Sequence, residues 1–259
     1  MADIIVERDG DVLILTLNRP ERLNALSDSM RSGLLQELSA EMTAQSARAI
    51  LLTGNGRGFC SGADLEPETI FARRPLIERH IQMGINQVIK TMRDLPVPVI
   101  AAVNGPAAGA GFSLALAADI MLVARSAKFH LSFVKIGAVL DGGASSMLVH
   151  KIGAARTSAL ALLGGSIDAQ TAEQWGLAFK IVDDDHLAEE ALALARRLAE
   201  GPPLALGLIK HEISFAQNAT LDDVLRHEAA AQGRAFASND FEEGVQAFLE
   251  KRKPKFKGV

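Results

Sequence analysis

The order of apolar and polar positions divides the chain into a mixed α/β part and a helical part. Asp9-Gly10 separates two apolar runs and is typical of a β-hairpin turn. Strands are predicted for five short apolar runs, at 3–7, 11–17, 49–52, 99–103 and 120–124. Helical spacing of apolar residues is found after Ser27, a suitable N-cap, where Met30 to Met42 share one face, and again over 77–92. Residues 66–76 show no regular pattern.

After Asp183 the pattern is helical throughout. Four helices are predicted, at 186–200, 204–217, 220–237 and 239–251. Thr220 and Asn239 suit the N-cap position of the last two, with Glu242 three residues after Asn239. We expect an α/β core over 1–199 and a helical region over 200–259. The basic end KRKPKFKGV is either a solvated tail or an anion site for a neighbouring subunit.

Two glycine-rich junctions follow predicted strands. In VIAAVNGPAAGAGFSLALAADI, at 99–120, the strand ends in an Asn-Gly-Pro turn and a helix is predicted from Ala107. The segment FCSGADL, at 59–65, repeats the order of strand, glycine and predicted helical turn. Glycines let backbone N–H groups approach a ligand closely, and a helix start favours negative charge. Close packing of a helix on a sheet explains the same glycines equally well.

Composition and charge exclude several classes of protein. The net charge of −4 provides no basic field for nucleic acid. The single cysteine, Cys60, excludes an intrachain disulfide, and the six scattered histidines suggest no metal site. The uncharged stretch 95–118 is interrupted by proline and glycine, so we do not interpret it as a membrane helix. With no signal peptide apparent at the start, we expect a cytoplasmic protein that binds neither nucleic acid nor membranes.

Four segments in order, NRPERLNAL, GRGFCSGADL, AAVNGPAAGAGFSLALAADI and FLEKRKPKF, resemble the enoyl-CoA hydratase/isomerase (crotonase) superfamily along nearly the whole chain. The resemblance implies a spiral of ββα turns and C-terminal helices that form a homotrimer or a dimer of trimers. It also implies an acyl-CoA thioester as substrate, with no separate cofactor. The shared chemistry is stabilisation of a thioester enolate by two backbone N–H groups, an arrangement called an oxyanion hole.

Matching the family motifs implies roles for individual residues. The two N–H donors would be those of Ala63 and Ala110. The CoA moiety would lie against Arg22, Asn24 and Ala25, and Lys255 and Phe256 would reach it from a neighbouring subunit. Other residues that would contact the substrate are Ser61, Gly62, Asp64, Leu65, Gly109, Ser113 and Phe133.

The sequence departs from the hydratases of this family at their two catalytic glutamates. Those positions are Ser113 and Phe133 here, which disfavours hydration of an enoyl-CoA. Asp141 instead occupies a position where isomerases of the family carry a single acidic base. The likeness is greatest to those that rearrange a ring epoxide in phenylacetate breakdown. By itself, a carboxylate before Gly142 and Gly143 could equally be a helix N-cap.

Other functions remain open. These are enoyl-CoA hydration, acyl-CoA binding without catalysis and, ranked lower, a dehalogenase that would need a histidine near Asn86. A nicotinamide dehydrogenase of the short-chain type is disfavoured because the chain has no tyrosine. We interpret Cys60 as a packed thiol and Asp64 as a cap, and His130 and His150 as structural residues.

Overall fold

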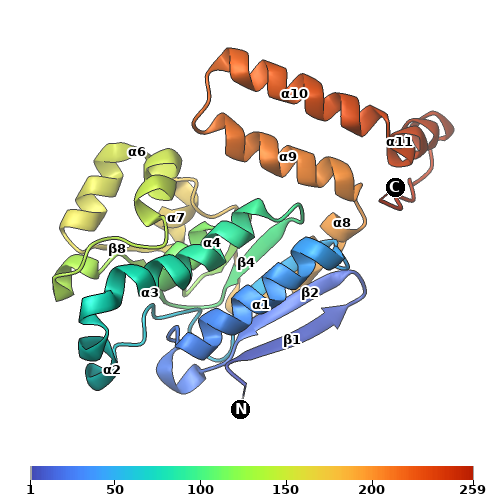
Figure 1. Cartoon of the computed structure of the whole chain (residues 1–259). Helices are drawn as coiled ribbons and strands as arrows, with labels where there is room; N and C mark the ends of the chain where they lie inside the picture. Colours follow the sequence, from blue (N-terminus) through green and yellow to red (C-terminus); the bar gives the residue numbers. More distant parts are fainter. Residues whose placement is uncertain (1, 259) are drawn as a thin grey trace.

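The computed structural model describes residues 2–258, in which strands form two sheets (Figure 1). The six-stranded sheet has the order β1 (Ile4–Asp9), β2 (Val12–Leu17), β3 (Ala49–Gly54), β4 (Val99–Val103), β6 (Ile120–Ala124) and β9 (Lys180–Val182). The three-stranded sheet has the order β5 (Ala107–Ala108), β7 (Lys128–His130) and β8 (Ser166–Asp168). β1 and β2 form an antiparallel hairpin, and the other pairs of the larger sheet are parallel. From β4 onward, each turn of the chain adds one strand to each sheet.

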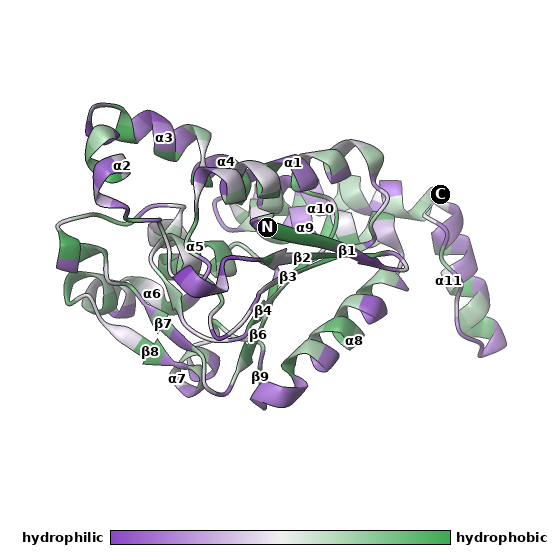
Figure 2. Cartoon of the chain, turned by 90° about the horizontal axis from the view of Figure 1, so that it is seen from below, coloured by the Kyte–Doolittle hydropathy of each residue, from purple (hydrophilic) through white to green (hydrophobic). Residues whose placement is uncertain are grey.

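Helices cover both faces of the larger sheet. Figure 2 shows α1 (Asp28–Ala44) and α4 (Ile85–Asp94) on one side and α8 (Leu187–Ala199) on the other. The remaining α-helices are α2 (Pro67–Ala72), α3 (Ile77–Met83), α5 (Ala110–Leu116), α6 (Ala144–Leu162), α7 (Ala169–Gln174), α9 (Pro203–Ala216), α10 (Leu221–Phe236) and α11 (Asn239–Glu250). Short 3-10 helices are η1 (Pro20–Arg22), η2 (Arg74–Leu76), η3 (Phe133–Ile136) and η4 (Asp184–His186).

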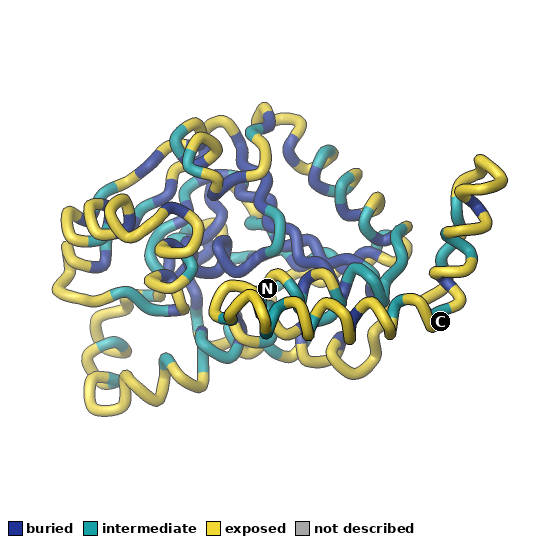
Figure 3. Tube along the Cα trace, turned by 90° about the horizontal axis from the view of Figure 1, so that it is seen from above, coloured by how far each residue is buried: buried dark blue, intermediate teal, exposed yellow. Residues whose placement is uncertain are grey.

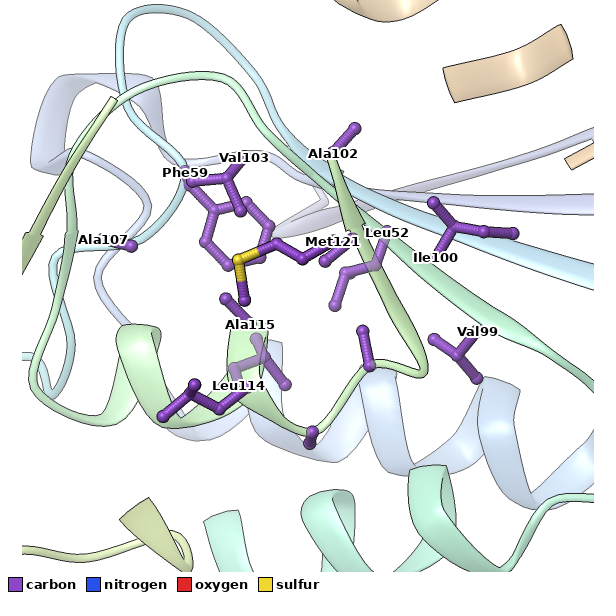
Figure 4. Close-up of a cluster of buried hydrophobic side chains, with 14 of the residues drawn as sticks. Leu52, Phe59, Val99, Ile100, Ala102, Val103, Ala107, Leu114, Ala115 and Met121 are labelled. Carbon is purple, nitrogen blue, oxygen red and sulfur yellow. The ribbon is translucent and has the colours of Figure 1, made fainter. Parts of the chain in front are cut away.

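The core lies between the parallel strands and the helices that pack on them. β4 is buried along its whole length because both of its faces are covered, which explains its continuous apolar run. Figure 4 shows Leu52 and Val103 from the strands, with Phe59, facing Leu114 and Ala115 of α5. In Figure 3 the buried part of the trace is concentrated in this region. Both glycine junctions therefore stand on a rigid base.

The last three helices extend away from the core, and much of their surface is exposed (Figures 1 and 3). Buried Lys210 on α9 ties them to it, since its Nζ donates to the carbonyl oxygens of Met92 (2.7 Å) and Val97 (3.0 Å) and pairs with Asp119 (2.8 Å). Several large apolar side chains nevertheless remain exposed here, including Leu221, Leu225, Phe236, Phe248 and Leu249.

Most predicted elements are confirmed. The α/β class, the hairpin and the helical C-terminal region are all present, and the side chains of Ser27 and Thr220 cap their helices as expected. Met42, however, is exposed on α1, and Glu41 is buried instead because Arg8, Ser46 and the Ala47 amide satisfy its carboxylate. The cap of α11 is Ser238 rather than Asn239, since the Ser238 hydroxyl accepts from the Phe241 amide.

Several local predictions are wrong. Ala107 and Ala108 form β5 rather than a helix, because pairing with β7 satisfies their backbone groups. No helical turn directly follows Ala63, which forms a parallel bridge with Leu26. The helix predicted over 77–92 is two helices separated by Gly84, and the segment 66–76 contains α2 and η2.

None of the helices within residues 2–258 combines the length and the apolar character needed to cross a bilayer.

Candidate functional site

The two glycine junctions meet above the ends of β3 and β4. A Cβ placed on Gly62 would lie 2.7 Å from the Ala108 carbonyl oxygen and 3.4 Å from the Ala110 nitrogen, so the chain segments at Gly62 and Ala110 are in contact. Within residues 2–258, neither the Ala63 nor the Ala110 amide donates to a backbone carbonyl. Ala63 is exposed and Ala110 is the first residue of α5. Two adjacent amides are thus left for an external acceptor.

The loop between β2 and α1 holds the Ala63 junction in place. The Leu26 amide donates to the Gly62 carbonyl (2.8 Å), and the Ser61 amide donates to the Leu23 carbonyl (2.9 Å). Gly62 has a φ of +94°, which favours glycine at this position. These contacts fix the direction of the Ala63 N–H group.

Asn24 is buried and its side chain is fully used inside the protein. Its Oδ1 accepts from the Arg19 amide (2.8 Å), while its Nδ2 donates to the carbonyls of Asn55 (2.9 Å) and Gly58 (2.8 Å). Asn24 therefore organises the loop, and only its main chain is available to a ligand. Ala25, the next residue, is also buried.

Arg19 is a site-supporting residue that the sequence analysis did not identify. Its Nη1 donates to the Ala25 carbonyl (2.9 Å) and pairs with Asp64 Oδ2 (2.6 Å). Asp64 is therefore an ion-pair partner rather than a helix cap, and the pair joins the two loops beside the site. The arginine lies in the quoted NRPERLNAL segment, but its position there does not indicate its partner.

Asp141 lies in the loop before α6 and contacts α5. The Ser113 hydroxyl donates to the Asp141 carbonyl oxygen (2.9 Å), and a Cβ on the adjoining Gly142 would lie 2.9 Å from Ser113 Cβ. Ser113 is fully buried, so its role is to hold this loop. The helix cap of α6 is Gly143, so Asp141 is not a cap.

The carboxyl of Asp141 has the character expected of a general base. Its Oδ1 is buried and has no hydrogen-bond partner in the described part of the chain. Burial raises the pKa of Asp141 to about 6, although the positive charge of Arg31 acts in the opposite direction. A carboxyl with a pKa near neutrality can both accept and return a proton.

Phe133 forms an apolar wall beside the Ala110 junction. The side chain is 9% exposed, and a Cβ on Gly109 would lie 3.7 Å from its Cζ. The Gly109 amide donates to the His130 carbonyl (3.0 Å), which fixes the strand that leads into α5. Phe133 and Gly109 are thus placed next to one of the two donors.

The remaining predicted residues are more scattered. Arg22 is exposed and pairs with Glu66 (3.2 Å), and Leu65 is 51% exposed. Phe256 lies at the other end of β3, where its carbonyl accepts from Arg48 (2.9 Å), and the Lys255 amide donates to Glu243 (2.8 Å). Within one chain, the tail therefore lies apart from Ala63 and Ala110.

Cys60 supports the site only by packing. The thiol is buried, which raises its pKa to about 12, so it is not a ready nucleophile. A Cβ on Gly111 would lie 2.3 Å from the Cys60 carbonyl oxygen, which shows how closely α5 approaches the chain at Cys60.

Comparison with known proteins assigns the chain to one group of enzymes. Residues 7–259 match the family model described as enoyl-CoA hydratase/isomerase. The chain is 44% identical to the 1,2-epoxyphenylacetyl-CoA isomerase of Escherichia coli, covering 100% of this chain and 99% of that protein. It is 36% identical to the 2,3-dehydroadipyl-CoA hydratase of the same organism, with complete coverage of both.

Solved structures show the same fold. An enoyl-CoA hydratase from Bacillus anthracis superposes with a TM-score of 0.95 at 33% identity, covering 99% of this chain and 100% of that one. A putative enoyl-CoA hydratase/isomerase from Mycobacterium abscessus gives 0.93 at 39% identity, covering 99% and 100%. The predicted fold class is thereby confirmed.

Proposed function

The chain belongs to the enoyl-CoA hydratase/isomerase family, and from this premise we propose that it is an acyl-CoA isomerase with Asp141 as its single acid/base. The observation that carries the proposal is the buried, unpartnered Oδ1 of Asp141 in a site that has no second carboxylate at the hydratase positions. The two unpaired amides of Ala63 and Ala110 supply the stabilisation that an enolate requires.

In the proposed reaction the thioester oxygen accepts hydrogen bonds from the Ala63 and Ala110 amides. The ionised carboxylate of Asp141 takes a proton from the carbon next to the thioester, and the C–H electron pair becomes part of a dienolate. Each such amide contributes about 10² to 10³ in rate, and the general base roughly 10² to 10⁴. The two amides therefore stabilise the negative charge on the thioester oxygen of the dienolate while Asp141 holds the proton.

In the second half of the reaction Asp141 returns a proton to the acyl chain, after exchange of its carboxyl proton with solvent. The dienolate electrons form a double bond between the second and third carbons and take the proton from Asp141 at the fourth carbon. The double bond has then moved by one position, and the carboxylate is ionised again. No water is consumed, so neither glutamate of the hydratases is needed, and the apolar Phe133 is suited to this site.

The proposed natural substrate is a ring epoxide of an aromatic acyl-CoA, as in phenylacetate degradation. It is supported by the 44% identity to a protein named 1,2-epoxyphenylacetyl-CoA isomerase. When Asp141 removes the proton beside the thioester, the C–H electron pair would form a double bond to the ring while the epoxide C–C bond opens and the ring expands. Asp141 would then return a proton to a ring carbon, giving an oxepin without a net gain or loss of atoms.

Two other functions use the same site. Relatives named as hydratases are also close, such as a probable enoyl-CoA hydratase of Rhodobacter capsulatus at 41% identity over 95% of this chain. Ser113 and Phe133 disfavour that chemistry here because neither can activate water. Acyl-CoA binding without turnover is less favoured, because it would not use the buried Oδ1 of Asp141, which has no hydrogen-bond partner in the described part of the chain.

We further propose that the chain forms a homotrimer or a dimer of trimers through α9–α11. The exposed apolar side chains on these helices support this, since single chains seldom leave so many uncovered. The placement of Lys255 and Phe256 away from the site is compatible with their reaching the CoA of a neighbouring subunit.

The product of 3-hexenoyl-CoA tests the proposed function. Mass spectrometry and ultraviolet absorbance should show a conjugated 2-enoyl thioester of unchanged mass, and Asp141→Asn should form it at least about 10²-fold more slowly. A product that has gained one water would establish a hydratase instead. If 3-hexenoyl-CoA is unchanged, the ring-epoxide thioester is tested next, and lack of turnover with both would refute the isomerase.

A further inference from the structure

Arg31 on α1 lies between the two halves of the proposed site. We propose that Arg31 is a positioning residue that holds the segment carrying Ala63 and places a positive charge near the Asp141 carboxyl. The inference rests on the proposed function, because it assigns Arg31 a role that supports Asp141 as the proposed base.

The first contact links Arg31, through Leu26, to the segment that carries Ala63. Its Nη1 donates to the Leu26 carbonyl (2.7 Å), and the Leu26 amide in turn donates to the Gly62 carbonyl (2.8 Å). Leu26 also forms the parallel bridge with Ala63. A change at Arg31 therefore reaches the Ala63 amide through one residue.

The second contact places Arg31 against the start of α4, which in turn packs against the loop that carries Asp141. A Cβ on Gly84 would lie 3.3 Å from the Arg31 Nε, so the guanidinium packs against the break between α3 and α4. Ile85, the next residue, packs against Gly142, where a Cβ would lie 3.4 Å from Ile85 Cγ1. Gly142 follows Asp141 directly.

The guanidinium is held in a defined position. Only 14% of its side chain is exposed, and its Nη2 pairs with Asp28, which also pairs with Arg73. Asp28 and Arg31 line a pocket of about 400 Å³ together with Arg79 and His80 of α3. One aspartate between two arginines leaves a net positive charge on this side of the site.

The positive charge of Arg31 favours the ionised form of the largely buried Asp141 carboxyl. Gly142, the residue after Asp141, lies against two uncharged residues, Ile85 from α4 and Ser113 from α5, and the Ser113 hydroxyl donates to the Asp141 carbonyl oxygen. Arg31 is the charged group that lowers the pKa of Asp141 against the larger effect of burial. Without that charge, the pKa would rise further and less of the base would be ionised at neutral pH.

The test measures the titration of Asp141 directly. In protein labelled with ¹³C at aspartate carboxyls, the Asp141 signal is assigned by its absence in Asp141→Asn. The midpoint should move to higher pH in Arg31→Met and Arg31→Gln and stay near the wild-type value in Arg31→Lys, which keeps the charge. Arg196→Gln is the matched control. Arg196 lies on α8, on the opposite face of the sheet from α1, and forms two hydrogen bonds to the Asp9 carboxylate (2.7 Å each).

Proton exchange of an acyl-CoA in D₂O gives the second readout. We expect roughly a tenfold loss of rate at pH 6 in Arg31→Gln, and a smaller loss at pH 9, where the base is ionised in both proteins. An unchanged Asp141 midpoint in folded Arg31→Gln and Arg31→Met would overturn the inference. Because the titration needs no substrate, absence of turnover in the wild type would refute the proposed function separately.

Discussion

At the residue scale, burial raises the pKa of Asp141 to a value suited to the proposed proton transfer, and it also lowers the stability of the folded chain at neutral pH. Its carboxyl has a pKa of about 6 in the folded chain because it is buried, against about 3.9 in an unfolded one. The folded state therefore binds the proton more strongly, and the free energy of unfolding falls as the pH rises from about 4 through 6. Above that range the buried charge costs about 2 to 3 kcal/mol.

We predict that Asp141→Asn is more stable than the wild type at pH 8, by up to about 2 to 3 kcal/mol, because it removes this buried charge. The difference should largely disappear at pH 4, where the wild-type carboxyl is protonated in the folded chain. Urea unfolding at both pH values measures it. Equal stabilities at pH 8 would contradict the burial of an ionisable carboxyl at this site.

Single residues were predicted unevenly from the sequence. Asp141, Ala63 and Ala110 are predicted from their positions in family motifs, and the structure brings the segments at Gly62 and Ala110 into contact. Arg19 and Arg31 were not identified, because an arginine in a loop or on an amphipathic helix resembles a solvated one. Their partners, the carbonyls of Ala25 and Leu26, are main-chain groups that no side-chain pattern records.

At the element scale, the site depends on how closely two junctions approach. Gly62 has a positive φ and no room for a Cβ beside Ala108. Gly176 has a similar φ of +78° but has nothing within 4 Å of its Cβ position. An alanine at Gly176 therefore tests backbone strain alone, whereas an alanine at Gly62 adds a steric clash between its Cβ and Ala108.

We predict that Gly176→Ala loses about 1 to 2 kcal/mol of stability from the left-handed backbone, and that Gly62→Ala loses more, because its Cβ also clashes with the Ala108 carbonyl oxygen. Only Gly62→Ala should also lose at least about 10²-fold in isomerisation rate, because it displaces the Ala63 amide. Thermal unfolding and the 3-hexenoyl-CoA assay measure the two effects. A fully active Gly62→Ala would mean that the Ala63 amide is not a donor to the substrate.

Elements were predicted best where local pattern and tertiary packing agree. The buried run of β4 and the Ser27 cap of α1 are examples. β5 was missed because Ala107 and Ala108 favour a helix locally, and only their pairing with β7 makes them a strand. The break at Gly84 was missed because apolar spacing continues across it.

At the scale of the whole molecule, the exposed apolar faces of the C-terminal helices support the proposed assembly into a homotrimer or a dimer of trimers. Phe248 on α11 is 82% exposed, and Phe179, in the core region before β9, is 68% exposed. We predict that Phe248→Glu shifts the sedimentation coefficient toward a smaller species, while Phe179→Glu does not. A wild type that sediments as a monomer would contradict the proposed assembly.

The helical C-terminal region itself was predictable from periodicity, but its assembly was not. The pattern shows which faces are apolar, whereas the tether of α9 to the core through Lys210 depends on carbonyls at Met92 and Val97, far away in the sequence. In the same way, the sequence could not place Lys255 and Phe256 relative to the site of their own chain.

The central claim is that one carboxylate moves a proton on an enolate held by two amides. Incubation of 3-hexenoyl-CoA in D₂O at pH 8 measures it most directly, by deuterium content at the second and fourth carbons. We predict deuterium at these carbons with the wild type and at least about a 10²-fold slower incorporation with Asp141→Asn. Equal incorporation by both proteins would show that another group is the base and would contradict the account.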